Sequence, residues 1–190
     1  MIRELRRKFF HILFGIILII LIYILGSFLS LIIIGSMLLI GLFISLLIMN
    51  KIHIPLISKI VEKVERQYEK KLPGYAAIMF FVAAIILLIL FYNNPILAIA
   101  SLMTTIFGDG IAAIIGKKYG KHFIINQEHY KKTIEGSLTL FLISTICMSF
   151  FIPLNIAIIA GLTATLIELL PLNDNLTVPI SAGIIIKVLL

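Results

Sequence analysis

The feature that constrains the fold most is the recurrence of long apolar runs along the whole chain. A helix needs about 20 apolar residues to cross a bilayer, and such runs follow one another here with only short polar interruptions. They make the chain 61% hydrophobic, well above the roughly 45–50% of a soluble domain. We therefore expect an all-α, polytopic membrane protein in which residues 1–190 form a single integral-membrane domain.

The apolar runs predict about seven membrane-spanning helices. Their expected positions are about 9–25, 28–49, 75–92 and 95–116, with further spans beginning near residues 136, 155 and 177. The first run follows a basic segment but is long and lacks a small-x-small cleavage site, so we expect it to be retained as a span. In the stretch 50–74, apolar residues at helical spacing alternate with charged ones. This pattern predicts an amphipathic helix on the membrane surface.

The distribution of basic residues predicts the orientation. Of the sixteen Lys and Arg residues, four precede the first span, six lie between the second and third, and five lie between the fourth and fifth. With alternating helices these three segments share one side, and the positive-inside bias makes that side the cytoplasm. We expect a multi-pass protein of the cell membrane with its N-terminus in the cytoplasm. The net charge of +7 then reflects topology, and we expect no nucleic-acid binding.

The stretch 107–136 carries the most informative polar residues. Asp109 lies near the end of an apolar segment, where an ionisable group costs at least ~2.5 kcal/mol at the centre of a spanning helix. Small residues recur there at every fourth position, which on a helix leaves a bare stripe for a neighbouring helix or a ligand: Gly108, Ala112, Gly116 and Gly120. Lysines and a second acid, Glu135, follow. This combination predicts a site for a phosphate-rich ligand bound together with a metal ion.

Each of these polar groups also has a structural explanation. Lysines that flank a span are most often orientation signals. His11 with Arg7 four residues earlier fits one helix face that reaches the interface, and Glu168 and Asp174 fit exposed helix ends. The chain has neither the P-loop pattern nor a dinucleotide-binding fingerprint, so any phosphate chemistry must be built on helix ends and loops.

Four groups of residues together resemble a known family. They are Arg7-Lys8 with His11 and Gly15; Gly108-Asp109-Gly110-x-Ala112 with Gly116-Lys117-x-x-Gly120-Lys121-His122; Lys131-Lys132-Thr133-x-Glu135-Gly136-Ser137; and Asp174-Asn175-x-Thr177-x-Pro179. The combination resembles the CTP-dependent lipid-alcohol kinases, the group that contains dolichol kinase, phytol kinase and CTP-dependent diacylglycerol kinase. These enzymes are related to the phosphatidate cytidylyltransferases, with which the second and third groups are shared.

The resemblance implies a kinase that transfers the γ-phosphoryl group of CTP, bound with Mg²⁺, to a lipid alcohol in the bilayer. With that chemistry in view, we assign Asp109 and Glu135 as Mg²⁺ ligands. The expected nucleotide and phosphate contacts are Lys117, Lys121, Lys131, Lys132, Thr133, Gly116 and Gly120. Asp174 or Glu168 is the expected base for the lipid hydroxyl, with Asn175 and Thr177 as orienting groups. Supporting roles fall to Arg7, Lys8, His11 and His122.

Two alternatives remain open from the sequence. A CTP-dependent cytidylyltransferase acting on a lipid phosphate would use the same acids and lysines. A transporter or a structural membrane protein would explain the spans, but not why acids and lysines gather at one cytoplasmic patch. The sequence does not distinguish a polyprenol, phytol or diacylglycerol acceptor, because each tail needs the same apolar groove, and it makes no prediction of the oligomeric state.

Overall fold

The computed structural model describes residues 2–50, 72–127 and 131–190 and confirms the all-helical class. The predicted amphipathic surface helix lies almost entirely outside these residues. The described helices are α1 (Ile2–Met49), α3 (Tyr75–Leu90), α4 (Pro95–Met103), η2 (Thr104–Asp109), α5 (Gly110–Tyr119), α6 (Ile134–Ser149), α7 (Leu154–Glu168) and α8 (Asp174–Leu189). The helices α3, α6, α7 and α8 begin within three residues of the positions predicted for their apolar runs, residues 75, 136, 155 and 177.

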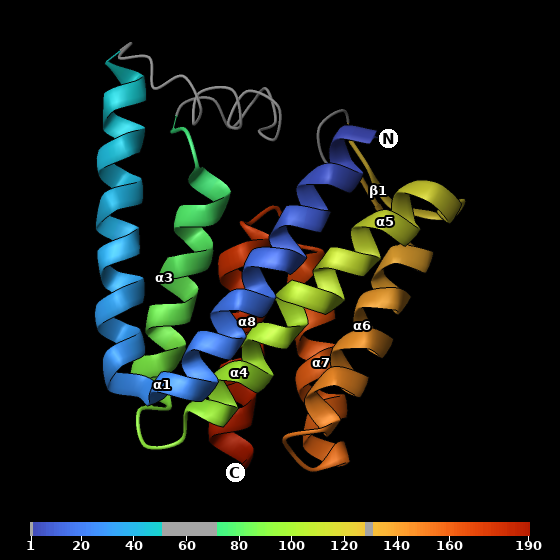
Figure 1. The fold of residues 1–190 in the computed structure, drawn as a ribbon. Helices are drawn as coiled ribbons and strands as arrows, with labels where there is room; N and C mark the ends of the chain where they lie inside the picture. Colours follow the sequence, from blue (N-terminus) through green and yellow to red (C-terminus); the bar gives the residue numbers. More distant parts are fainter. Residues whose placement is uncertain (1, 51–71, 128–130) are drawn as a thin grey trace.

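The helix α1 consists of two helical halves joined at a sharp bend. Gly26 has φ 68° and ψ −172°, a left-handed backbone conformation that glycine adopts at little cost because it lacks a Cβ. The next residue, Ser27, donates a hydrogen bond of 2.6 Å to the Tyr92 carbonyl. The Gly-Ser pair therefore produces the reversal of chain direction that the predicted helical hairpin needs, and in Figure 1 the two halves diverge from the bend.

A π-helical turn interrupts the stretch from Pro95 to Tyr119. Thr104–Asp109 forms this turn, η2, between α4 and α5, and Pro95 occupies the first turn of α4, where its missing N–H is tolerated. Single π-helical turns within α-helices are rare and are frequent at functional sites. The sequence predicts one regular span here, so the π-helix is a new observation, and its last residue is Asp109.

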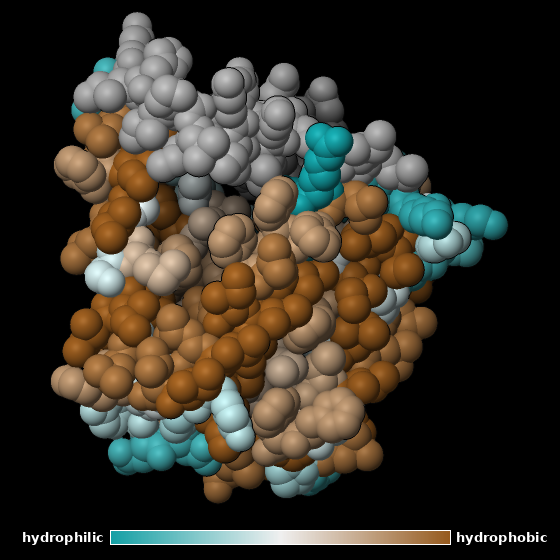
Figure 2. All heavy atoms as spheres, in the orientation of Figure 1, coloured by the Kyte–Doolittle hydropathy of each residue, from teal (hydrophilic) through white to brown (hydrophobic). Residues whose placement is uncertain are grey.

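The structure contains fewer long apolar helices than the predicted number of spans. Within residues 2–50, 72–127 and 131–190, two stretches are long and apolar enough to cross a membrane, Leu5–Met49 and Pro95–Tyr119. Three shorter apolar helices are α3, α6 and α7. Figure 2 shows apolar side chains over the middle of one face, with polar residues towards its two ends. These observations indicate a membrane protein, whereas seven complete spans remain a prediction.

A pair of short strands lies between α5 and α6, where no strand is predicted from the sequence. The strands β1 (Phe123–Asn126) and β2 (Lys131–Thr133) pair antiparallel, with Ile125 opposite Lys132 and Asn126 opposite Lys131. β1 contains the aromatic and β-branched residues that favour strands. The all-α prediction therefore needs this small addition.

The stripe of small residues is covered by another helix. A Cβ added at Gly116 would lie 3.3 Å from Gly136 Cα and 3.0 Å from Thr133 Oγ1, so α5 and the start of α6 approach closely. Ala112, one turn earlier, is buried. Of the two uses that the sequence left open for this stripe, helix packing is the one observed.

The ends of the helices separate into two groups. Figure 1 shows the N-terminus and the segment between α5 and α6 at one end, and the α3–α4 turn and the C-terminus at the other. Two of the three basic segments therefore share one end, as predicted, and the third lies outside the described residues.

A buried cluster of carboxylates and lysines as the candidate active site

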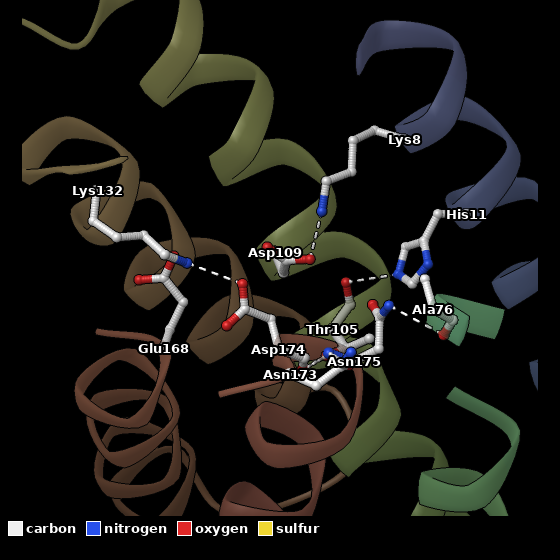
Figure 3. A network of polar contacts seen from close by, with 10 residues as sticks. All are labelled: Lys8, His11, Ala76, Thr105, Asp109, Lys132, Glu168, Asn173, Asp174 and Asn175. Carbon is white, nitrogen blue, oxygen red and sulfur yellow. Dashed lines mark hydrogen bonds and ion pairs between the residues drawn. The ribbon is translucent and has the colours of Figure 1, made fainter. Parts of the chain in front are cut away.

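Five charged side chains from five different elements meet in the interior near the end that carries the basic segments (Figure 3). They are Lys8 from α1, Asp109 from η2, Lys132 from β2, Glu168 from α7 and Asp174 from α8. Uncompensated charges are expensive in a protein interior. Their convergence is therefore the strongest polar signal in the described part of the chain.

Lys8 and Asp109 form a buried ion pair. Lys8 Nζ donates to Asp109 Oδ2 at 2.5 Å, and the two side chains are only 8% and 7% exposed. The partners are 101 residues apart in sequence. Asp109, predicted as a site residue because of its apolar surroundings, thus has a lysine from the first helix as its direct partner.

Lys132 joins the two remaining carboxylates. Its ammonium donates to Asp174 Oδ2 at 3.0 Å and also to Glu168 Oε1. Burial opposes the charged form of Lys132, but the adjacent Asp174 and Glu168 carboxylates outweigh this and raise its pKa above the usual value. Lys132 therefore remains charged throughout the neutral pH range.

Helix ends bring the two carboxylates of α7 and α8 together. Glu168 is the last residue of α7 and Asp174 the first of α8, and a carboxylate at a helix N-terminus is favoured by the helix dipole. Asn173 caps α8, because its Oδ1 accepts a hydrogen bond of 3.1 Å from the Asn175 N–H. Ser137 Oγ, in the first turn of α6, lies 3.5 Å from Glu168 Oε2.

The three carboxylates fit a divalent cation. One oxygen each from Asp109, Glu168 and Asp174 lies within 4.8 Å of the others. Asp174 Oδ1 is buried and has no hydrogen-bond partner, which leaves an acceptor available. Oxygen-only ligand sets suit Mg²⁺, and the five charged side chains carry one formal negative charge in excess. Asp109, Glu168 and Asp174 together therefore form an oxygen-only ligand set that suits Mg²⁺.

A layer of hydrogen bonds surrounds the cluster (Figure 3). His11 Nε2 lies 3.2 Å from the Thr105 carbonyl oxygen, and Thr105 Oγ1 donates to the Asp174 carbonyl oxygen at 3.3 Å. Asn175 Nδ2 donates to the Ala76 carbonyl oxygen at 3.2 Å, which ties α8 to α3. These bonds connect the helices that carry the charged side chains.

Glu135 takes part in a different interaction. Its Oε1 accepts from the Lys121 N–H at 3.0 Å and from the His122 N–H at 3.3 Å, and it lies 2.8 Å from His122 Nδ1. The pKa of Glu135 falls to about 2, because the carboxylate accepts first from its own backbone N–H and then from His122 and Lys121. Among the described residues, Glu135 is not in the three-carboxylate group. It fastens the loop after α5 to the start of α6.

The other predicted site residues lie around the cluster rather than in it. Lys117, Lys121, Lys131 and His122 are exposed, and Arg7 is partly buried. Thr133 caps α6, because its Oγ1 accepts a hydrogen bond from the Gly136 N–H at 3.2 Å. Gly120 packs against the same side chain, since a Cβ added at Gly120 would lie 2.7 Å from Thr133 Oγ1. Thr177 Oγ1 donates to the Asn173 carbonyl oxygen at 3.1 Å. Of the predicted phosphate contacts, only Lys132 enters the buried cluster.

Two residues of the network were not predicted. Thr105 lies in an apolar run. Its contacts with His11 and Asp174 could not be predicted from the sequence, because both partners lie on other helices. Asn173 has a signal, since Asn immediately before a helix is a preferred cap. Neither residue is charged.

We expect Glu135→Gln to weaken the attachment of the segment at Lys121 and His122, just after α5, to the start of α6. Metal binding should not be weakened. The folded-state pKa is depressed, so the charge of Glu135 contributes stability fully above about pH 4.5, and this contribution is lost as the pH falls towards about 2. The difference in melting temperature from the wild type should shrink as the pH falls below about 4.5, because Glu135 becomes protonated and resembles the glutamine. Thermal unfolding in detergent and Mn²⁺ binding would measure both effects. Weaker Mn²⁺ binding would make Glu135 a metal ligand, as the sequence predicts.

Comparison with known proteins gives one match. No protein-family model matches the chain, and no solved structure matches it. An alignment over 102 positions, which covers 48% of this chain and 43% of the other protein, shows 28% identity to a phytol kinase from Synechocystis sp.. Over about half of its length, the chain is therefore similar to an enzyme that is named for the phosphorylation of a lipid alcohol.

Proposed function

We propose that the protein is a membrane-embedded kinase that transfers the γ-phosphoryl group of CTP to the hydroxyl of a lipid alcohol. The observation that carries the proposal is the buried cluster of Asp109, Glu168 and Asp174 with Lys8 and Lys132. The similarity to a phytol kinase supports a lipid alcohol as the acceptor. CTP as the donor rests on the family resemblance of the sequence motifs.

The roles of the charged residues follow from the needs of phosphoryl transfer, which depends mainly on positioning and charge neutralisation. Asp109, Glu168 and Asp174 would hold Mg²⁺. When bound, this ion would offset the negative charge of the phosphates during transfer. Lys8 and Lys132, which face carboxylates in the structure, would turn towards phosphate oxygens when the nucleotide binds.

Asp174 is the stronger of the two candidate bases. Glu168 contacts Lys132 and Ser137 through its two oxygens, whereas Asp174 Oδ1 has no hydrogen-bond partner. Asp174 would contact Mg²⁺ through Oδ2, once Lys132 has turned towards the phosphates, and would accept the proton of the lipid hydroxyl on Oδ1. The lipid oxygen then bonds to the γ-phosphorus, the bond from that phosphorus to the bridging oxygen breaks, and CDP leaves.

The fold supports an arrangement in which each substrate approaches from its own phase. The exposed lysines Lys117, Lys121 and Lys131 lie at the same end as the cluster, and by the positive-inside bias we place this end in the cytoplasm, where CTP is dissolved. The small-residue stripe is filled by α6. We therefore place the lipid tail along the apolar outer surface, in contact with the bilayer.

An isotope experiment tests the proposal. Purified protein in detergent is given Mg²⁺ and CTP labelled at either the α- or the γ-phosphorus, with phytol, a polyprenol or diacylglycerol as acceptor. We expect only the γ-label to enter the lipid, as a monophosphate ester, while CDP accumulates. ATP, GTP and UTP at the same concentration test the choice of donor.

The controls separate the alternatives. An Asp109→Asn variant, purified in parallel, gives the background for contaminating kinases. Incorporation of the α-label into a lipid phosphate, with release of pyrophosphate, would replace the kinase by a cytidylyltransferase. Absence of transfer from every nucleotide to every acceptor would contradict enzymatic activity of this class.

A further inference from the structure

One face of the first helix docks on the π-helical turn that ends at Asp109. Lys8, His11, Ile12 and Gly15 follow the i, i+3, i+4, i+7 spacing and so share one side of α1. Their partners are Asp109, Thr105, Gly110 and Ile106, respectively. In Figure 1 this half of α1 runs in the direction opposite to the chain from α4 to α5, so the two segments are antiparallel.

Two glycines set how closely these segments approach. A Cβ added at Gly15 would lie 2.6 Å from the Ile106 side chain, and one added at Gly110 would lie 3.0 Å from the Ile12 side chain. Each isoleucine therefore occupies the space that a glycine on the other segment leaves open. This reciprocal packing fixes the separation at which Lys8 and His11 act.

The tautomer of His11 follows from its partner. A carbonyl oxygen can only accept, so the 3.2 Å contact between His11 Nε2 and the Thr105 carbonyl requires the proton to be on Nε2. The imidazole also packs edge-on against the Phe80 ring, with centroids 5.2 Å apart. Phe80 belongs to α3, so α3 also holds the His11 imidazole in place.

The bond from His11 reaches an unusual backbone position. In a regular α-helix the Thr105 carbonyl would accept from the N–H of residue 109, but residues 104–109 are π-helical. His11 supplies a donor to a carbonyl of this wider turn. On the other side, Thr105 Oγ1 bonds to the Asp174 carbonyl oxygen, so Thr105 links α1 to the helix that begins with Asp174.

We propose that His11 is a positioning residue, which holds the π-helical turn so that the Asp109 carboxylate faces those of Glu168 and Asp174. The inference rests on the proposed function in one respect, that these carboxylates bind a divalent metal ion. His11 itself does not touch the reacting groups in this role. It acts through Thr105 and the backbone leading to Asp109.

Two variants of His11 separate this role from others. In His11→Gln the side-chain amide places an N–H donor near the position of Nε2, whereas His11→Leu keeps a comparable volume and removes the donor. We expect His11→Leu to weaken Mn²⁺ binding by about 10–100-fold, the usual effect of losing a group that orients a metal ligand. His11→Gln should remain close to the wild type in Mn²⁺ affinity and activity.

Mn²⁺ binding is measured from the loss of the free-ion electron paramagnetic resonance signal, on full-length protein without nucleotide. Hydrogen–deuterium exchange of the peptide covering residues 104–110 provides a readout that needs no metal. We expect faster exchange there in His11→Leu, and wild-type exchange in His11→Gln. The KM for the lipid alcohol should be unchanged in both variants.

The outcomes distinguish the inference from the proposed function. Wild-type Mn²⁺ affinity together with wild-type exchange in His11→Leu would overturn the positioning role. If the wild-type protein binds no Mn²⁺, the metal site of the proposed function fails, and the exchange of residues 104–110 alone decides whether His11 holds the turn. Full loss of activity in His11→Gln, with Mn²⁺ binding retained, would overturn positioning and make the imidazole itself a reacting group.

Discussion

Asp109→Asn should reduce phosphoryl transfer by at least about a hundredfold, the scale of losing one key electrostatic group in an active site. The substitution keeps the shape of the side chain but removes the charge that pairs with Lys8 and that would balance a divalent cation. Initial rates with γ-labelled CTP and a lipid alcohol measure the effect. Mn²⁺ affinity, measured on the same preparation, should fall as well.

A control at the opposite end of the molecule accompanies this variant. Lys187, in the last turn of α8, lies over the Phe91 ring at 5.9 Å from its centroid, far in the fold from the cluster. Lys187→Ala should leave the rate close to that of the wild type. Near-normal turnover of a correctly folded Asp109→Asn protein would mean that Asp109 has only a structural role.

Lys132→Met should cause the largest loss of stability among single substitutions in the cluster. Its ammonium contacts Glu168 and Asp174, and the Lys132 and Glu168 side chains are 13% and 8% exposed. Removing one partner of a buried ion pair typically costs about 3–5 kcal/mol, because the remaining charge stays buried. Thermal unfolding in detergent should therefore show a clearly lower midpoint, and activity should be lost.

The neighbouring residue offers a matched control for this experiment. Lys131 precedes Lys132 on the same strand but is exposed, so Lys131→Met should change stability little. The double variant Lys132→Met, Glu168→Gln should recover part of the lost stability, since one of the stranded charges is removed, without recovering activity. Equal stability of Lys132→Met and Lys131→Met would mean that the buried ion pairs contribute nothing to folding.

The helices could be predicted from the sequence because they depend on local patterns. Apolar runs interrupted by turn residues, such as Gly26-Ser27 and Asn94-Pro95, determine where helices begin and end. The π-helix and the two-stranded sheet were not predicted, because each element consists of only a few residues. Neither element is long enough to show a hydrophobic periodicity in the sequence.

The members of the site were predictable, but their grouping was not. Asp109 is predicted because it is an acid in an apolar run, whereas Glu168 and Asp174 enter the prediction as candidate bases through the family resemblance. Glu135 is predicted as the second metal ligand because it is an acid that follows the lysines. The structure instead brings Asp109 to Glu168 and Asp174, through the packing of η2 against α8, which no spacing along the chain encodes.

The pairing of Lys8 with Asp109 also has a consequence for the biogenesis of the protein. Synthesis produces Lys8 first, and the helix that carries Asp109 follows about one hundred residues later. An unpaired aspartate inside the bilayer would cost ~2.5 kcal/mol or more, depending on its depth. If both segments span the bilayer, Lys8 on the first helix would offer Asp109 a partner as soon as the later segment inserts, and the pairing would then favour insertion of that segment.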